Sequence, residues 1–510
     1  MPRRSAAKHS NATTGPPTAE APRALIALAA IVVVLLASYR INDYDVWQHL
    51  LVGKVVWQTH AAPTTHLWTW PSHGQPDLNS SWGFEALLYG FYRVAGVPGL
   101  FVWRWWTTLA AFALALMAAR TLRARGPATV VVCVIAMIAA RDRMEPRPET
   151  LTAVLLAAFV WILERRRQGQ GNATVWLPAL SLVWANVHLS WFFGPALVAL
   201  HALAAKRGTR ARLWAVAAAC VAVSFLNPFG WRALWEPFDF YLHRSHELLY
   251  RAVLELTPPE ITEWRELAPL ALLLWPLLAL RRLLRGRWDP VEVTLLVVTS
   301  FLAWRARRFL GVYVVVMAPY AARDAEEWLA ASPARLRAWA AGRGGSLAAA
   351  GLCVALALPT LTRSEAPLGI GINAHVRYDG VCDFIERHDV RGRMFNQYET
   401  GGYLLWRLWP DRLPFTDVHQ AGMPADMDVY IRATAFEPYW RQLETKFRFD
   451  HAVINRRGVS DSLTAFLDRD TTWSRVFADD QALLYLKRGP AFDRLIGEFG
   501  QASRQPAATR

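Results

Sequence analysis

Apolar residues along this chain gather in long blocks that short polar segments separate. An apolar stretch of about 17 residues or more matches the hydrocarbon thickness of a bilayer, about 30 Å. A soluble protein of 510 residues would need two or three separate cores, and charged residues would interrupt its apolar stretches. The pattern predicts a mainly α-helical integral membrane protein with about eleven transmembrane helices, over residues 24–39, 101–119, 127–140, 148–164, 174–188, 190–205, 211–227, 268–280, 290–304, 306–322 and 346–362.

One further apolar block, 82–97, carries Glu85 and Arg93 and decides the topology. Short cytoplasmic loops are richer in Arg and Lys than outer loops. If 82–97 does not cross the membrane, arginine clusters such as 165–167 fall on one side. We therefore expect 82–97 to lie on the outer surface as a helix. The N-terminus is then cytoplasmic. We expect the chain to be a multi-pass protein of the plasma (inner) membrane.

This topology divides the chain into three parts. Residues 1–23 are expected to form a disordered cytoplasmic tail, because they are polar and precede the first apolar block. Residues 24–362 form the transmembrane module, whose outer loop, 40–100, contains surface helices. The remainder, 363–510, predicts a small extracytoplasmic α/β domain, since it has soluble character and strand-like runs at 452–454 and 482–488.

Composition narrows the possible partners. The formal charge is +15, but the arginines lie mainly between apolar blocks, where they act as topology signals. Nucleic acid is therefore not an expected partner, whereas membrane lipids are. Three of the four cysteines lie inside apolar blocks, so the sequence offers no extracytoplasmic disulfide framework.

The segment RINDYDVWQHLLVGKVVW, residues 40–57, places polar residues directly after the first predicted span. We expect a helix that starts near Tyr44, with Asn42 or Asp43 as its cap. Four-residue spacing then puts one stripe toward the space above the membrane: Asp45, His49 and Gly53. The opposite stripe is apolar and suits the lipid interface: Trp47, Leu50, Leu51 and Val55.

Three residues of this segment are candidate catalytic residues: Asp43, Asp45 and His49. A carboxylate at the membrane surface can take a proton from an attacking hydroxyl. The sequence demands no cofactor; if a divalent cation binds, Asp43 and Asp45 are its candidate ligands. The alternative interpretation is a surface helix with a solvated polar face.

A cluster of arginines, RARR at 305–308, lies between two apolar blocks on the predicted outer side. Arginine there opposes the positive-inside trend, and its planar guanidinium suits phosphate binding. The candidate residues for binding a lipid-linked phosphate are Arg305, Arg307 and Arg308, together with Arg141 and Arg147 of RDRMEPRPE. The alternative is contact with ordinary lipid headgroups. Further candidate pocket residues are Glu85, Asn186 and His188.

Several motifs follow one another along almost the whole chain: DYDVWQHLLVGKVVWQTHAAPTTHLWTW, SWGFEALLYGFY, RPE, LVWANVH, NPFGW, EW at 263–264 and FNQYETGGYLLWRLWP. This series resembles a group of bacterial multi-pass membrane proteins whose first module is similar to GT-C glycosyltransferases. That superfamily includes protein O-mannosyltransferases and aminoarabinose transferases. The resemblance implies a GT-C-like fold and a polyprenyl-phosphate-linked sugar as donor, with a glycan, lipid or protein as acceptor at the outer face.

The resemblance also implies roles for the candidate residues. Asp43 or Asp45 corresponds to the acid that follows the first span in GT-C enzymes, and a single base implies inversion at the sugar carbon. Asp417, in PFTDVHQ, stands where the group often has a different motif, and its role stays open. The Gly401–Gly402 pair is expected to form a tight turn. A transporter or a non-catalytic lipid-binding membrane protein remains the alternative function.

Overall fold

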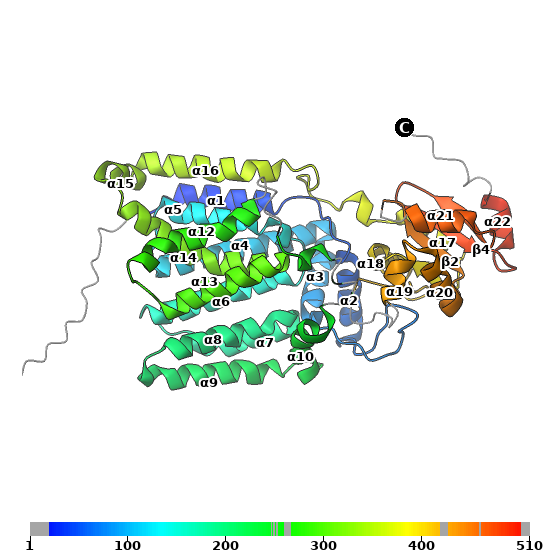
Figure 1. The fold of residues 1–510 in the computed structure, drawn as a ribbon, viewed down its shortest axis with the longest axis horizontal. Helices are drawn as coiled ribbons and strands as arrows, with labels where there is room; N and C mark the ends of the chain where they lie inside the picture. Colours follow the sequence, from blue (N-terminus) through cyan, green and yellow to red (C-terminus); the bar gives the residue numbers. More distant parts are fainter. Residues whose placement is uncertain are drawn as a thin grey trace, which may run out of the picture.

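The structure is a computed structural model that describes residues 20–245, 247, 250, 253–259, 267–418, 427–457 and 461–500. Four sequence predictions fall wholly or partly outside these ranges: the disordered tail up to residue 19, the EW pair at 263–264, the end of PFTDVHQ at 419–420, and parts of the 363–510 domain, at 419–426, 458–460 and 501–510. The described part is a bundle of long helices with a smaller domain at one end (Figure 1).

A helix lies at each of the eleven predicted spans, and these helices run side by side in Figure 1. They are α1 (Arg23–Leu36), α4 (Val97–Thr121), α5 (Pro127–Ala139), α6 (Glu149–Arg167), α7 (Leu177–Val187), α8 (Phe193–Ala204), α9 (Arg207–Ser224), α12 (Leu267–Leu284), α13 (Pro290–Arg305), α14 (Leu310–Ala330) and α16 (Arg343–Leu361). Among the described helices, two, α4 and α16, are long and apolar enough to cross a membrane by themselves. The number of spans therefore stays a prediction.

Three shorter helices lie at the same end of the bundle as the smaller domain. Helices α2 (Val46–Thr59) and α3 (Trp82–Ala95) run across the ends of the long helices, roughly perpendicular to them (Figure 1). Helix α10 (Trp231–Asp239) lies near them, whereas α15 (Ala334–Ala341) lies at the opposite end. The crosswise direction of α3 is the arrangement predicted for a surface helix at 82–97.

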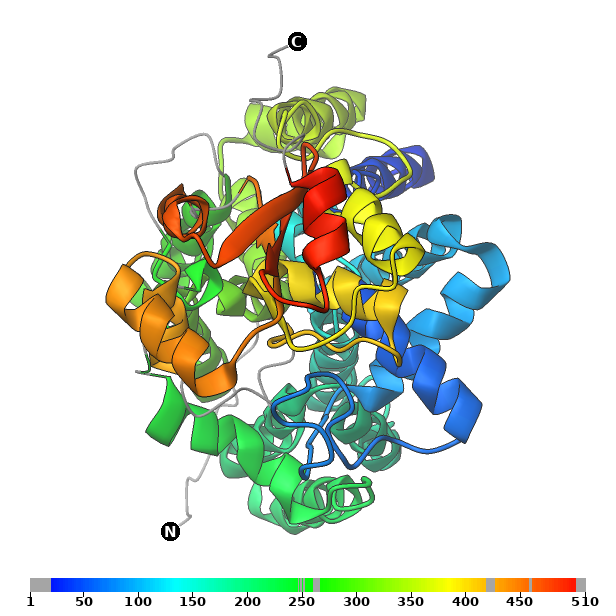
Figure 2. The same cartoon turned by 90° about the vertical axis from the view of Figure 1, so that its right-hand side faces the viewer.

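The C-terminal part of the chain forms an α/β domain that covers one end of the bundle (Figure 2). Its sheet has the strand order β1-β2-β4-β3, in which β1 and β2 are parallel and the other pairs are antiparallel. The strands are β1 (Met394–Asn396), β2 (His451–Asn455), β3 (Trp473–Ala478) and β4 (Ala482–Lys487). The helices are α17 (Asp379–Arg387), α18 (Gly401–Leu408), α19 (Met427–Ala433), α20 (Glu437–Phe447), α21 (Asp461–Arg469) and α22 (Asp493–Phe499). The two predicted strand-like runs coincide with β2 and β4.

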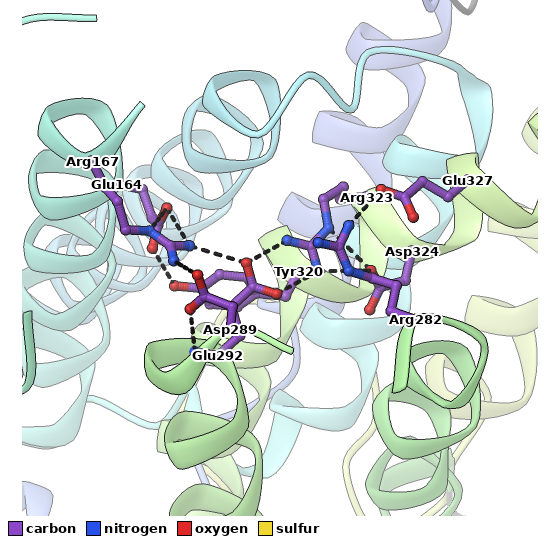
Figure 3. Close-up of polar contacts among 9 residues, drawn as sticks. All are labelled: Glu164, Arg167, Arg282, Asp289, Glu292, Tyr320, Arg323, Asp324 and Glu327. Atoms are coloured by element: carbon purple, nitrogen blue, oxygen red, sulfur yellow. Dashed lines mark hydrogen bonds and ion pairs between the residues drawn. The ribbon is translucent and has the colours of Figure 1, made fainter. Parts of the chain in front are cut away.

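A polar network fastens the end of the bundle that lies away from this domain (Figure 3). Glu292 on α13 accepts two hydrogen bonds from Arg323 on α14, at 2.6 and 2.8 Å, and one from Arg167 on α6, at 3.0 Å. We call it the Glu292 network, and it consists of Glu164, Arg167, Arg282, Asp289, Glu292, Tyr320, Arg323, Asp324 and Glu327. Charges from four helices are thus paired inside one region of the bundle.

Candidate active site

The loop between α1 and α2 is held in shape by the Asp43 side chain. Its Oδ1 atom accepts a hydrogen bond from the backbone N–H of Asp45 at 3.1 Å, as an Asx turn does. Helix α2 begins at Val46, so Asp45 is its N-cap residue, without a side-chain cap bond. The predicted start near Tyr44 is therefore too early, because Asp43 shapes the turn before the helix instead of capping it.

Arg147 binds both of these aspartates. Its Nε and Nη2 atoms donate to the two oxygens of Asp43 at 3.0 and 2.7 Å, and Nη2 also lies 3.2 Å from Asp45 Oδ2. The Asp43 side chain is completely buried, whereas 30% of the Asp45 side chain is exposed. A forked pair of this kind is among the strongest charge-assisted contacts in proteins. Asp43 is thus fully engaged, and Asp45 is the accessible carboxylate.

Glu255 extends the cluster beyond Arg147. It accepts from Arg147 Nη1 at 2.6 Å and lies 3.0 Å from Arg143 Nη1, and Arg143 also pairs with Glu149 at 3.6 Å. These residues form what we call the Asp43 cluster: Asp43, Asp45, Arg143, Arg147, Glu149 and Glu255. The sequence analysis missed Glu255, because nothing local distinguishes it in its loop and only the fold brings it to Arg147.

The pKa values of two partly exposed acids of the cluster, Asp45 and Glu255, are shifted in opposite directions. Burial is the main cause that raises the pKa of Asp45 to about 6; Arg147 opposes this rise and Asp43 adds to it. Burial also acts to raise the pKa of Glu255, but Arg147 and Arg143 outweigh it and lower that pKa to about 2. Near neutral pH, Glu255 is a fixed anion, while Asp45 has the pKa of a group that exchanges protons.

A cavity with about 940 Å³ of unoccupied space, part of it open to solvent, adjoins the cluster. Arg143, Glu149, His188 and Arg308 line one part of it. The rest is mainly apolar and includes Ala111, Met137, Leu156, Phe193, Val312 and Val315. Within the described ranges, Arg308 has no hydrogen-bonded or ion-paired partner. The cavity therefore combines an available guanidinium with a long apolar wall.

The other predicted phosphate-binding arginines are placed differently. The Arg307 guanidinium donates to the Pro258 carbonyl oxygen at 3.3 Å, and its side chain is half-buried. Arg305 is exposed at the end of α13. Arg141 is buried, donates to the carbonyl oxygens of Leu36 at 3.3 Å and Ala366 at 3.1 Å, and stacks on Tyr39. The structure thus brings Arg147 and Arg308 to the site, but it does not bring Arg141 there.

The stripe of α2 that was expected to face the space above the membrane is packed against α3. His49 Nδ1 lies 2.9 Å from Glu85 Oε1, and Asn79 donates to Glu85 Oε2 at 2.6 Å. A Cβ atom at Gly53 would collide with the Glu85 carbonyl oxygen, so the glycine permits close helix packing. His49 and Gly53 thus face α3 and not the space above the membrane, whereas Asp45 at the start of this stripe is partly exposed.

The apolar stripe of α2 does not lie in the lipid interface, so that prediction is wrong. Trp47, Leu50, Leu51 and Val55 are all buried. The C-terminal domain covers this side, and Trp47 Nε1 donates to the Val376 carbonyl oxygen at 2.8 Å. An amphipathic pattern does not distinguish a lipid surface from a protein surface, because both are apolar.

The C-terminal domain is hydrogen-bonded to the first turn of α2. Gln48 Nε2 donates to Asp417 Oδ2 at 2.9 Å, and the Val418 amide donates to Gln48 Oε1 at 3.1 Å. Gly401 and Gly402 begin helix α18, so the predicted tight turn is wrong. A Cβ atom on Gly402 would lie 2.8 Å from the Tyr44 carbonyl oxygen. Gly402 lets the domain approach the loop that carries Asp45, and Asp417 binds Gln48 of α2.

Asn186 and His188 lie at the end of α7 near this site. Asn186 accepts a hydrogen bond from Trp82 Nε1 at 3.1 Å and donates to the Leu226 carbonyl oxygen at 3.1 Å, so it ties α3 to α7. His188 lines the cavity, and its Nδ1 atom lies 2.6 Å from Ser190 Oγ. Asn186 thus joins α3 to α7, while His188 lines the cavity.

A divalent cation does not fit the cluster as it is arranged. Both oxygens of Asp43 are bound by Arg147, which also contacts Asp45. A cation between the two aspartates would lie against this guanidinium and be repelled. Over the part of the chain that the structure describes, no group of three His, Cys, Asp or Glu side chains is arranged to hold a metal ion.

Comparison with known proteins supports the fold. No protein-family model and no curated protein sequence matches the chain. Among solved structures, ArnT from Cupriavidus metallidurans in the apo state superimposes with a TM-score of 0.51 and 13% sequence identity, over 91% of this chain and 97% of that one. The arabinofuranosyltransferase AftD from Mycobacteria gives a TM-score of 0.56 and 16% identity, over 93% of this chain and 41% of that one.

Both of these proteins are GT-C glycosyltransferases. The chain therefore shares the fold of these two proteins, and the GT-C-like fold that its sequence motifs imply is confirmed. Identities this low show the fold alone, since a fold hosts more than one function. The chemistry has to be argued from the Asp43 cluster and its cavity.

Proposed function

We propose that this protein is a membrane glycosyltransferase that moves a sugar from a polyprenyl-phosphate donor to an acceptor hydroxyl. The observation that carries the proposal is a chain of ion pairs that runs from Asp45, partly exposed and with its pKa raised to about 6, through Arg147 and Glu255 to Arg143. Arg143 lines a largely apolar cavity together with Arg308. The apolar wall suits a prenyl chain, and the arginines suit its phosphate. A transporter would not need this pairing of a base with an anion site.

In the proposed reaction Asp45 is the general base. The acceptor oxygen forms a bond to the anomeric carbon while the bond from that carbon to the phosphate oxygen breaks. The phosphate leaves with the electron pair, and the hydroxyl proton passes to the Asp45 carboxylate. A single displacement of this kind inverts the configuration at the anomeric carbon.

The remaining residues position the reactants and stabilise charge. Asp43 is buried against Arg147 and keeps that guanidinium beside Asp45. Arg308 and Arg143 face the cavity, where they would stabilise the negative charge that the leaving phosphate gains. Two arginines can do this without a divalent cation, so we propose a reaction that needs none.

The proposed reaction takes place at the outer face of the plasma membrane. In this orientation the N-terminus is cytoplasmic and the C-terminal domain lies outside, where it holds α2 through Gln48 and Asp417. The arginine clusters between the predicted spans support this orientation. The acceptor then approaches Asp45 from the side of the C-terminal domain.

The experiment that tests the proposal compares envelope glycans by mass spectrometry in cells with and without the gene, and in cells that carry Asp45→Asn. We expect the variant to lose transfer by about 10²- to 10⁴-fold, because the isosteric amide cannot accept the proton. Asp411→Asn, which changes an exposed aspartate of the C-terminal domain, is the matched control and should keep full transfer. Immunoblots of the membranes should show equal protein levels.

Two results would contradict the proposal. Full transfer by Asp45→Asn, at equal protein level, would exclude Asp45 as the base. Identical glycans with and without the gene, in cells and in membranes supplied with polyprenyl-phosphate sugars, would favour a transporter or a non-catalytic lipid-binding protein.

A further inference from the structure

A second hollow lies between the bundle and the C-terminal domain, and it shares no lining residue with the cavity that Arg143 and Arg308 line. It holds about 1130 Å³ of unoccupied space, part of it open to solvent. We call it the Arg40 groove and define it by the side chains that the argument uses: Arg40, Trp47, Tyr92, Ile370, Arg377 and Trp406. Its walls come from both parts of the molecule.

The lining of the Arg40 groove carries positive charge only. It includes Arg40 and Arg377 but no acidic side chain. Arg377 is paired with Asp379 at 2.6 Å, whereas the Arg40 side chain is exposed and has no polar partner within the described ranges. An arginine that stands free beside aromatic rings is suited to binding an anion.

The groove lies at the level where the long helices end. Arg40 follows the last turn of α1, and Val97 and Pro98, at the start of α4, also line it. The loop at its rim exposes two large aliphatic side chains, with 45% of Leu368 and 55% of Ile370 accessible. Aromatic rings, arginines and exposed aliphatic side chains together are typical of the headgroup region of a membrane.

We propose that the Arg40 groove binds the phosphate-bearing headgroup of a membrane lipid, at a site separate from the donor cavity. Arg40 and Arg377 bind the phosphate, the rings of Tyr92 and Trp406 cover the headgroup, and Ile370 contacts the start of an acyl chain. Because the groove joins α1 and α4 to the C-terminal domain, the bound lipid holds this domain against the membrane. This site does not depend on the proposed transfer reaction.

The test measures lipid binding to the purified full chain by native mass spectrometry, with phosphatidylglycerol as the anionic probe. Arg40→Gln and Arg377→Gln should each raise the apparent Kd for phosphatidylglycerol by about 10-fold, the usual effect of one charge-assisted contact. Arg494→Gln, which changes an exposed residue of α22, is the matched control and should leave the Kd unchanged. Since Arg40 has no internal partner within the described ranges, its replacement should not disturb folding.

A second arm separates a lipid from other phosphate compounds. Ile370→Ser should weaken the binding of phosphatidylglycerol but leave the binding of glycerol 1-phosphate unchanged, because only the lipid has an acyl chain. Equal binding of the soluble phosphate and the lipid would overturn the proposal, as would unchanged lipid affinity in Arg40→Gln. A third outcome would show that the groove binds an anionic glycan instead of a lipid. In that case an anionic trisaccharide, such as trigalacturonate, would displace the lipid from the wild-type protein and not from Arg40→Gln, and the proposal would be overturned.

Discussion

The two ends of the helix bundle both concentrate charge, but they use it differently. In the Glu292 network, the central carboxylate receives hydrogen bonds from Arg323 and Arg167, and Tyr320 and Asp324 continue the pairing between helices. In the Asp43 cluster, one carboxylate is bound on both oxygens while its neighbour Asp45 stays partly exposed. One arrangement closes the bundle, and the other leaves a reactive group accessible.

The space beside each cluster differs in the same way. The hollow next to the Glu292 network holds about 290 Å³, whereas the cavity next to the Asp43 cluster holds about 940 Å³. Arg282 and Arg323 line the smaller one and are both paired, and Arg287 at its edge is exposed to solvent. Arg308 is half-buried and lines the larger one without a described partner. Paired charge beside a small hollow stabilises the bundle, and a half-buried unpaired charge beside a large cavity is suited to binding.

The largest expected effect that separates the two ends is on stability. Glu292→Gln should lower the free energy of unfolding by about 3 kcal/mol, because it leaves Arg323 and Arg167 short of a buried anion. Asp45→Asn should change it little, since Arg147 keeps Asp43 and Glu255. Thermal unfolding in detergent, followed by tryptophan fluorescence, measures both. Equal destabilisation by the two variants would contradict the division of roles.

A smaller effect is expected on donor use. Arg308→Gln should raise the KM for the polyprenyl-phosphate donor by about 10- to 100-fold, because it removes a cavity-lining guanidinium that would bind the phosphate. Arg305→Gln is the matched control, as its side chain is exposed at the end of α13 and does not line the cavity. Initial rates at varied donor concentration give both values. The same KM in the wild type and Arg308→Gln would exclude a phosphate role.

Much of the fold follows from the sequence pattern, because apolar blocks long enough for a bilayer have few alternatives to a helix. Each predicted span contains a helix, and the crosswise direction of α3 agrees with the interpretation of 82–97 as a surface helix. The burial of α2 could not be predicted in this way. Its apolar stripe contacts the C-terminal domain, which is more than 300 residues away along the chain.

The candidate site was predictable only where chemistry is local in the sequence. Asp43 and Asp45 are conspicuous because two acids stand close together directly after the first apolar block, and Arg147 lies in a short arginine-rich loop. The contact of Glu255 with Arg147 depends on how loops distant in the sequence meet. So does the fact that Arg308 lines the cavity while Arg141 does not. The direction of a side chain toward the cavity or into the core is set by packing, which spacing alone does not encode.

The smallest and most specific effect concerns pH. Because burial raises the pKa of Asp45 to about 6, a base at this position is ionised above that pH and protonated below it. We expect kcat/KM to be constant above pH 7 and to fall about 10-fold per pH unit below 6. If Glu255 were the base, its pKa of about 2 would leave the profile flat over this range. Glu145, whose pKa burial raises to about 7, is the competing group, so Glu145→Gln should keep the acidic limb. Loss of that limb in Glu145→Gln would assign the titration to Glu145 and remove Asp45 as the base.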